Sequence, residues 1–357
     1  MVVLALVAAQ AAAVHPGVCV PSELACPTCR IELHLQVSIG GASDPVGLAN
    51  VSKVAADRRG HFIVAPAGYG NSAAVYDSTG RFLRLIEGGG GGPGEFQSPI
   101  RHIAIGRADT IHLFTNYRES VFGPGGDALV RASRIPLPIR HVAPLPDGSL
   151  IIQYLPIGAR PTHDPLHRID EDRQQVVSFG ASDADGPHLL PDETVRPIAL
   201  ARDARSIWIA RTNTYQLERW SLGGSRETSV SRDAEWFTPW HAQPPGAPFE
   251  ARPLARLMAI HEDPKGFLWT VTYVAAERWR RSDIRPEGDI RQLDVLPSDL
   301  YDTVIEVINP STGQVLARRQ LRGAFAGFAG DRLLYRTRYT AEGDLALDVW
   351  FVTVNTH

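Results

Sequence analysis

Residues 101–114 read RHIAIGRADTIHLF, and this stretch combines three features that recur along the chain. A bulky apolar residue is followed by alanine in Ile103-Ala104, a short polar turn spans Arg107 to Thr110, and a β-rich run covers Ile111 to Phe114. Turns of this kind join adjacent antiparallel strands. The stretch therefore predicts the first hairpin of a β unit.

The pair of a bulky residue and alanine recurs in six copies, each followed by a polar turn and a β-rich run. The copies are Val54-Ala55, Ile103-Ala104, Val142-Ala143, Ile198-Ala199, Met258-Ala259 and Phe325-Ala326. A second hairpin follows in most units, as in Ala74 to Arg84. Units of four strands at spacings of about forty to seventy residues predict an all-β, six-bladed β-propeller with four antiparallel strands per blade.

The physics of sheet packing supports this architecture. A twisted four-stranded sheet that is apolar on both faces is not stable alone, so blades stack face to face around an axis. Near that axis the inner strands converge, and a small residue such as alanine fits there. No stretch between the predicted strands keeps a helical period for ten or more residues, which argues against an α/β fold.

The two ends of the repeat array predict how the ring closes. Leu345 to Val352 forms a third strand in the last unit, and Ile31 to Ser38 is a strand without a partner near the other terminus. Pairing the two completes the sixth blade and removes two exposed sheet edges.

The N-terminal segment has the composition of an export signal. Residues 1–13 are apolar and small, and His15-Pro16-Gly17 ends the run, which is too short to span a bilayer. We predict a signal peptide at 1–13, a cysteine-containing segment at 14–29, a propeller at 30–357, export to the periplasm or the exterior, and no transmembrane span. No Lys or Arg precedes Arg30, so an ordinary alanine-rich helix is the alternative.

The chain has three cysteines, Cys19, Cys26 and Cys29. Cys26-Pro-Thr-Cys29 leads into a predicted strand, whereas a thioredoxin-like redox motif opens a helix. A zinc site formed with His15 would have four ligands but lacks the paired spacing that marks such sites. A disulfide between Cys26 and Cys29 in an oxidising compartment is the prediction, and it leaves Cys19 unassigned.

Charge and the glycine run exclude two classes of ligand site. The formal net charge of the 357 residues is -3, which gives no basic field for nucleic acid. Residues 87–99 read EGGGGGPGEFQSP and resemble a phosphate loop only in their glycines. No helix start and no Lys-Ser/Thr follow, and Pro99 favours extended backbone before it, so we interpret the run as a connection between blades.

The junction itself carries a resemblance. Gly-Gly-Pro-Gly-Glu-Phe96 followed by Ser-Pro-Ile-Arg-His-Ile-Ala104 resembles the inter-blade junction of NHL-type repeats. Over residues 26–357 the chain resembles the bacterial, secreted six-bladed β-propeller family, to which Leu300 to Pro310 and the Cys-x-x-Cys-x-Ile start at Cys26 are also similar. Uneven repeat spacing departs from regular NHL repeats. The resemblance implies this fold and export, and implies no particular reaction.

A second regularity predicts a ligand site. Arginine stands two positions before the bulky residue in units two to five, where units one and six have Ser52 and Gly323. The arginines are Arg101, Arg140, Arg196 and Arg256, and His102 and His141 follow the first two. If all inner strands start on one face, these guanidinium groups converge at a channel mouth and favour an anionic ligand. Pairing with acidic residues of neighbouring blades is the alternative.

Three insertions interrupt the repeat, at Gly158 to His167, Glu227 to Pro253 and Ala275 to Asp302. The middle one contains the aromatic residues Trp236, Phe237 and Trp240. Long loops on a rigid scaffold often carry binding residues. These side chains would either cover the channel or pack against the propeller wall.

The sequence contains no Gly-x-Ser-x-Gly, His-Glu-x-x-His or Rossmann fingerprint. Six-bladed propellers include calcium-dependent lactonases and a zinc-dependent lyase, whose ligands come from separate blades. His102 and His141 are the near-axis candidates for such a site, and no carboxylate repeats at a hub position. We therefore predict a binding or interaction module for a small anionic ligand or a protein, without a cofactor and with no catalytic or metal residue assigned. The alternative is a calcium- or zinc-dependent hydrolase, lactonase or lyase.

Overall fold

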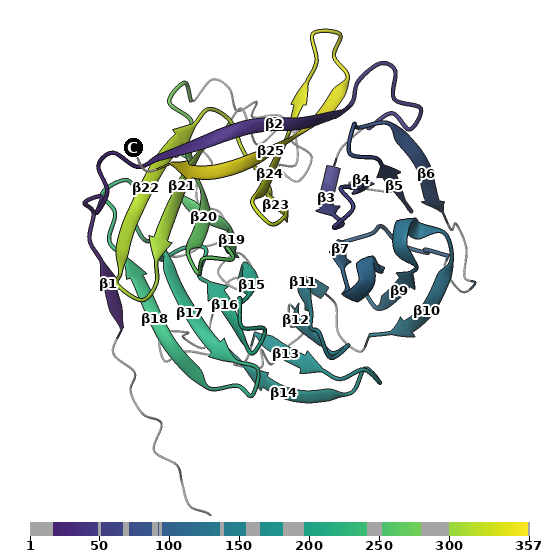
Figure 1. Ribbon diagram of the computed structural model, residues 1–357, viewed down its shortest axis with the longest axis horizontal. Coiled ribbons are helices and arrows are strands. Elements are labelled where there is room, and N and C mark those ends of the chain that lie inside the picture. Colours follow the sequence, from purple (N-terminus) through teal and green to yellow (C-terminus); the bar gives the residue numbers. More distant parts are fainter. Residues whose placement is uncertain are drawn as a thin grey trace, which may run out of the picture.

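Six antiparallel sheets surround a central axis (Figure 1). This computed structural model describes residues 17–48, 51–66, 71–87, 92, 95–135, 139–154, 165–180, 196–240, 252–279 and 300–355. Each sheet contributes four antiparallel strands to one blade. The prediction of an all-β, six-bladed propeller is confirmed.

The strands of each blade run outward from the axis, and the blades are numbered in chain order. Blades 1 and 2 contain β3 (Val51–Ala56), β4 (Phe62–Pro66), β5 (Ser72–Tyr76) and β6 (Phe82–Glu87), then β7 (His102–Ile105), β8 (Ile111–Phe114), β9 (Arg118–Phe122) and β10 (Leu129–Arg134). Blades 3 and 4 contain β11 (Ile139–Pro144), β12 (Leu150–Tyr154), β13 (Leu166–Ile169) and β14 (Gln175–Phe179), then β15 (Ile198–Leu200), β16 (Ser206–Ala210), β17 (Gln216–Ser221) and β18 (Arg226–Arg232). Blade 5 contains β19 (Arg256–Glu262), β20 (Leu268–Ala275), β21 (Tyr301–Asn309) and β22 (Gln314–Leu321). Blade 6 contains β23 (Gly327–Gly330), β24 (Leu333–Tyr339), β25 (Leu345–Asn355) and β2 (Arg30–Gly40). Two short 3-10 turns, Arg107–Asp109 and Pro124–Gly126, lie in blade 2.

The inner strands β3, β7, β11, β15, β19 and β23 contact one another in turn around the axis (Figure 1). Five of the six predicted alanines lie within these strands. The sixth, Ala326, lies directly before β23 and donates its N–H to the carbonyl oxygen of Tyr335 at 2.9 Å. The alanines therefore encircle one axis, as the repeat predicts.

The pairing of a bulky residue with alanine follows from the two faces of an inner strand. Ile103 packs in the cluster between blades 1 and 2, whereas Ala104 packs against the cluster between blades 2 and 3. Val142 and Ala143 divide in the same way between the interfaces of blades 2–3 and 3–4. Successive residues of a strand point to opposite faces. Blades 2 and 3 thus reach back with the bulky side chain and forward with the small one.

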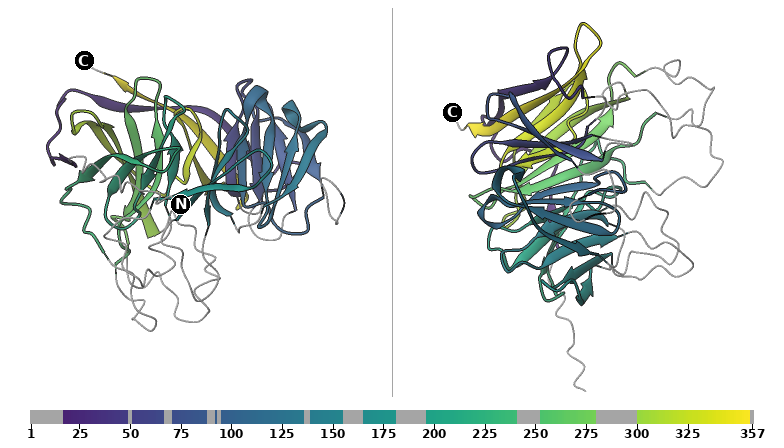
Figure 2. Two further views of the ribbon diagram at one scale, coloured as in Figure 1. Left: turned by 90° about the horizontal axis from the view of Figure 1, so that it is seen from below. Right: turned by 90° about the vertical axis from the view of Figure 1, so that its right-hand side faces the viewer.

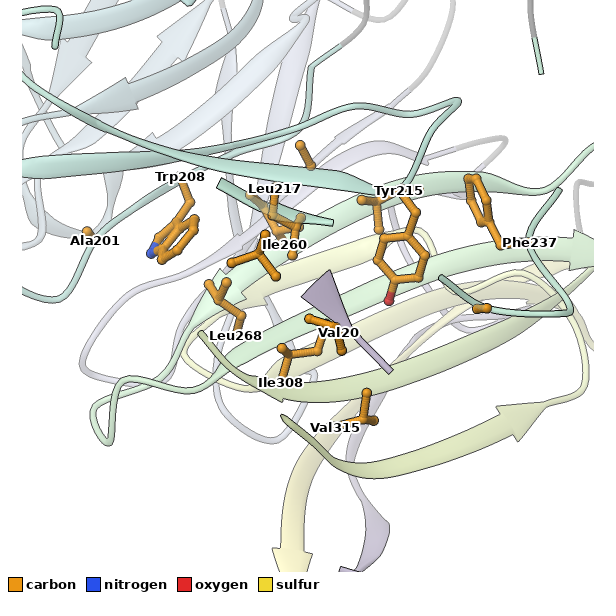
Figure 3. Close-up of a cluster of buried hydrophobic side chains, with 14 residues drawn as sticks. Val20, Ala201, Trp208, Tyr215, Leu217, Phe237, Ile260, Leu268, Ile308 and Val315 are labelled. Carbon is orange, nitrogen blue, oxygen red and sulfur yellow. The ribbon is translucent and has the colours of Figure 1, made fainter. Parts of the chain in front are cut away.

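Each neighbouring pair of blades shares one hydrophobic cluster of described residues. The cluster between blades 4 and 5 is built on Trp208, Tyr215 and Phe237, and Val20 inserts into it from outside the blades (Figure 3). Between blades 1 and 2, Phe96 of the glycine-rich junction is buried. The chain then runs from Glu95 to Ile100 without a helix and enters β7, which agrees with a connection between blades.

The ring closes through strands from the two ends of the chain. β2 pairs antiparallel with β25, from Arg30 opposite Asn355 to Gly40 opposite Ala346 (Figure 1). Ile31 is buried in the cluster between blades 5 and 6, and Val37 and Ile39 are buried in the cluster between blades 6 and 1. The predicted closure of the sixth blade is confirmed.

The segment before β2 forms a feature that the sequence did not predict. β1 (Val18–Val20) pairs in parallel with β18 as a fifth strand of blade 4. The N–H of Ala25 then donates to the carbonyl oxygen of Val315 in blade 5 at 2.8 Å, and β2 follows in blade 6. Residues 18–40, here named the N-terminal strap, therefore join the outer edges of blades 4, 5 and 6 (Figures 1 and 2).

Cys26 and Cys29 form a disulfide directly ahead of β2. Both sulfur-bearing residues pack against the cluster between blades 5 and 6, while Cys19 is free and exposed. The predicted disulfide is confirmed. It uses the thiols of Cys26 and Cys29, which the alternative zinc site would need as ligands. His15 and the predicted signal peptide at 1–13 lie outside the described residues.

All three predicted insertions have wrong boundaries. Residues 227–232 belong to β18, and Leu166 and His167 begin β13. Ala275 ends β20, and Tyr301 and Asp302 begin β21. β18 reads RETSVSR, with one buried apolar side chain, Val230. Because the other six residues of β18 are polar, the strand shows no alternation of apolar and polar residues, and its sequence is easily mistaken for a loop.

A buried ion pair connects the strap with blades 4 and 5. Arg232 donates to Glu306 from Nε at 3.0 Å and from Nη2 at 2.9 Å, and Tyr215 donates to the same carboxylate at 2.7 Å. Arg232 also donates to the carbonyl oxygen of Pro21 in the strap at 2.8 Å. The side chains of Arg232 and Glu306 are fully buried.

We expect Arg232→Ala to lower the free energy of unfolding by about 3–5 kcal/mol, because it leaves the Glu306 carboxylate buried without its partner. The thermal midpoint should fall on the order of 10 °C, measured by calorimetry. Arg81→Ala, which breaks the exposed ion pair with Asp77, is the matched control and should leave the midpoint unchanged. Equal midpoints for the two variants would contradict this role of Arg232.

Candidate ligand site at the channel mouth

The two faces of the disc differ in how the chain uses them. Because strands alternate in direction within a blade, all first strands begin on one face, here named the start face. The turns that join first to second strands and third to fourth strands lie on the opposite face, here named the turn face.

Carboxylates on the turn face are engaged by the backbone. Asp57 accepts the N–H groups of Arg59 at 2.9 Å and His61 at 2.8 Å, and Asp263 accepts those of Lys265 and Phe267. Asp side chains stabilise turns in this way. The same role is played by Asp77, Asp147, Asp170 and Asp203. These carboxylates are thus part of the hairpin structure.

The four predicted arginines lie at the beginnings of first strands. Arg101 directly precedes β7, Arg140 lies in β11, Arg196 stands two residues before β15, and Arg256 opens β19. Arg101 is exposed, Arg256 is half-buried and Arg196 is buried at 2% exposure. The side chain of Arg140 lies outside what the structure describes. All four positions are therefore on the start face, in four successive blades.

The two predicted histidines are brought together. The ring centroids of His102 on β7 and His141 on β11 lie 5.6 Å apart. His102 is buried and His141 is half-buried. The adjoining inner strands of blades 2 and 3 thus form an imidazole pair beside Arg101.

The aromatic residues of the middle insertion pack against the propeller wall. Trp236 meets the edge of Tyr215 at a centroid distance of 5.8 Å, within the cluster between blades 4 and 5. Trp240 is buried and donates from Nε1 to the carbonyl oxygen of Ala255 at 2.6 Å. Trp236 and Trp240 therefore pack against the propeller wall and do not cover the channel. Trp240 instead holds the guanidinium of Arg256, which lies 5.1 Å from its ring centroid.

Sequence reasoning missed Lys53 on β3. It directly precedes Val54-Ala55, as His102 precedes Ile103-Ala104 and His141 precedes Val142-Ala143. Its side chain is half-buried, and desolvation lowers the pKa of its ammonium group. The shared register was visible in the sequence. It could have identified Lys53 as the residue of blade 1 that corresponds to His102 in blade 2 and His141 in blade 3.

A tyrosine cluster was also missed, on blades 5 and 6. The rings of Tyr273 and Tyr301 stack at a centroid distance of 5.2 Å, and Tyr335 is close enough to influence Tyr273 electrostatically. Burial raises the pKa of Tyr335 to about 12, opposed in part by the backbone N–H of Val54, which donates to its phenolic oxygen. Burial likewise raises the pKa of Tyr273 well above its usual range.

The hub of the propeller is poor in carboxylates. Among the described first and second strands of the six blades, Glu262 is the one acidic residue. It lies at the turn-face end of β19 and accepts hydrogen bonds from Nε1 of Trp208 at 2.9 Å and the N–H of Arg202 at 3.0 Å. At the start-face end, Asp302 of the third strand β21 accepts the N–H of Gly323 at 2.8 Å, whereas the described first strands carry Lys53, His102, His141 and Arg256 there.

No group of three or more His, Cys, Asp or Glu side chains that could hold a metal ion occurs among the described residues. In the same part of the chain, no helix is long and apolar enough to cross a bilayer.

Comparisons with known proteins identify the fold. No protein-family model matches the chain, and no curated protein matches it. Among solved structures, it is similar to a "putative exported protein" from Bacteroides fragilis, with a TM-score of 0.60 and 9% identity over 95% of this chain and 99% of that chain. A member of the DUF4221 family from Bacteroides vulgatus gives a TM-score of 0.58 and 9% identity over 92% and 99%. The propeller fold is shared. At 9% identity, this similarity shows the shared fold and no shared ligand or activity.

The tyrosine cluster predicts a loss of stability at alkaline pH. The folded-state pKa of Tyr335, about 12, exceeds the usual value near 10, so the unfolded chain releases this proton first and stability falls as pH rises through that interval. Unfolding by denaturant at about pH 9 and about pH 11 should show the loss, and Tyr335→Phe should reduce it. Tyr117→Phe, at an exposed tyrosine, is the control. A Tyr335→Phe protein with the full alkaline loss would contradict the prediction.

Proposed function

We propose that the protein is an exported propeller that binds a small anionic ligand at the start-face mouth of its channel. The observation that carries the proposal is the charge distribution at the hub. Lys53, Arg101, His102, His141 and Arg256 belong to the start-face ends of the inner strands, where the described first and second strands offer no carboxylate.

The chemistry of these groups suits an oxyanion. A guanidinium group pairs bidentately with carboxylate or phosphate, and the exposed Arg101 is accessible to a ligand in solution. The neighbouring imidazoles of His102 and His141 supply N–H donors. A ligand held between these groups would exchange its hydration shell for several charged donors.

Export is part of the proposal and is supported by three observations. Residues 1–13 have the composition of a secretory signal, and the Cys26–Cys29 disulfide suits an oxidising compartment. A solved structure with the same fold carries the name of an exported protein. The alternative of a metal-dependent hydrolase, lactonase or lyase requires converging ligands, and the described residues contain no such group.

We expect Arg101→Glu with Arg140→Glu to weaken the binding of inorganic phosphate and citrate at least tenfold, which corresponds to about 1.4 kcal/mol. Two positive charges are then replaced by negative ones at the predicted mouth. Isothermal titration calorimetry measures the effect.

Arg107→Glu provides the matched control, because this exposed arginine lies at the turn-face end of the same inner strand. It should leave both affinities unchanged. If the double variant and the control bind phosphate and citrate equally well, the start-face mouth is not the anion site.

A further inference from the structure

Blade 6 has a three-stranded extension on the start face. β23 pairs with β24 from Leu333 to Tyr335, whereas β24 and β25 stay paired as far as Tyr339 opposite Leu345. β2 accompanies β25 to Gly40. These three strands therefore continue past the inner strand, and the hairpin of β24 and β25 projects from the ring (Figure 1).

Two arginines on this extension share one carboxylate. Arg336 and Arg338 lie on the same face of β24, because residues two apart in a strand point the same way. Asp348 of β25 is 3% exposed, and its Oδ2 lies 2.8 Å from Nε of Arg338 and 3.8 Å from Nε of Arg336. Among the described residues, no other carboxylate forms an ion pair with either arginine. The pair of guanidinium groups thus keeps a net positive charge.

Two aromatic rings hold Arg336 in place. Its guanidinium carbon lies 5.1 Å from the ring centroid of Phe325 and 5.7 Å from that of Trp350, and both rings pack in the cluster between blades 5 and 6. Its Nη1 also donates to the carbonyl oxygen of Arg322 at 3.4 Å. Because this guanidinium is already ordered, little side-chain entropy is lost when it binds a further acceptor.

The same face has more hydrogen-bond donors than acceptors. Nε of Arg336 and Nε1 of Trp350 are buried, and neither donates a hydrogen bond to a described residue. The side chain of Arg338 is 43% exposed, and its hydrogen bonds to Asp348 and Ser38 use Nε and Nη2. Buried donors in proteins normally have an acceptor. A carboxylate offers two acceptor oxygens and the negative charge that complements these groups.

An exposed apolar side chain adjoins the donors. Leu35 of β2 stands opposite Trp350 of β25, and directly opposed residues of antiparallel strands are neighbours on one face of the sheet. Leu35 is 51% exposed. Apolar surface therefore lies beside the shared positive charge on the face that blade 6 turns toward blade 5.

We propose that this face of blade 6, formed by Leu35, Arg336, Arg338 and Trp350, binds an organic acid with an apolar body. The two arginines bind the carboxylate through charge-assisted hydrogen bonds, and Leu35 and Trp350 contact the apolar body. The excess positive charge selects an acid, and the exposed leucine favours one with an apolar body over an inorganic anion. The site is separate from the channel mouth and does not rest on the proposed function, since its residues all belong to strands of blade 6.

Titration of the intact protein with phenylacetate tests the inference. In spectra of protein with ¹⁵N-labelled tryptophan, the indole N–H resonance that Trp350→Phe removes should shift during the titration. By calorimetry, Arg338→Gln should bind phenylacetate about tenfold more weakly, because a charge-assisted hydrogen bond is lost. Arg134→Gln, at an exposed arginine of the outer strand β10, is the matched control and should bind like the unmodified protein.

Leu35→Ala tests the apolar contact. Because Leu35 is already half exposed, the variant should fold, and it should bind phenylacetate about threefold more weakly while acetate binding is unchanged. Val130→Ala is the matched control, since Val130 is 65% exposed on β10, and it should change neither affinity.

The double variant Arg101→Glu with Arg140→Glu separates this site from the channel mouth. It should bind phenylacetate with full affinity, whatever it does to phosphate and citrate binding. Loss of phenylacetate binding in the double variant together with full binding in Arg338→Gln would overturn the inference. A Trp350 resonance that does not move, or equal affinities for acetate and phenylacetate, would overturn it as well.

Discussion

Six twisted sheets bury both of their faces only in a closed ring, and the ladder between β2 and β25 closes it. An open array would leave blade 1 and the last blade with one apolar face each in water and two strand edges unpaired. The cluster between blades 6 and 1 contains Val37 and Ile39 from β2 together with Val54 and Phe62 from blade 1. The closing strand therefore supplies backbone pairing to one blade and packing to the next.

The polarity of the disc follows from the same architecture. Hairpins on the turn face need a side-chain acceptor for free backbone N–H groups, and Asp57 and Asp263 meet that need. Asp side chains therefore recur on the turn face. The start-face ends of the inner strands carry Lys53, Arg101 and Arg256. The turn-forming carboxylates and the basic side chains of the inner strands therefore lie at opposite ends of those strands.

Much of the fold could be predicted from sequence because its periodic signals are physical requirements of the inner strands. A bulky residue and an alanine at fixed register reflect two unequal interfaces, and an unpaired strand at Ile31 must find an edge. β1 could not be predicted, since three residues with no internal partner show no pattern until β18 provides one. The candidate site was recovered in part. The positions of Arg101 and the pair His102 and His141 were predictable from register, whereas the packing of Trp236 and Trp240 depends on tertiary contacts with Tyr215 and Arg256.

The pairing of β2 with β25 has a consequence for biosynthesis. The ladder joins residues about 310 positions apart, as the bond between Ser38 and Asp348 illustrates, so β2 of a nascent chain has no partner until β25 has been made. Long-range pairing of this kind is slow to form. The ring therefore stays open during synthesis of blades 1 to 5, and it closes in one late step that buries the blade interfaces on either side of β2.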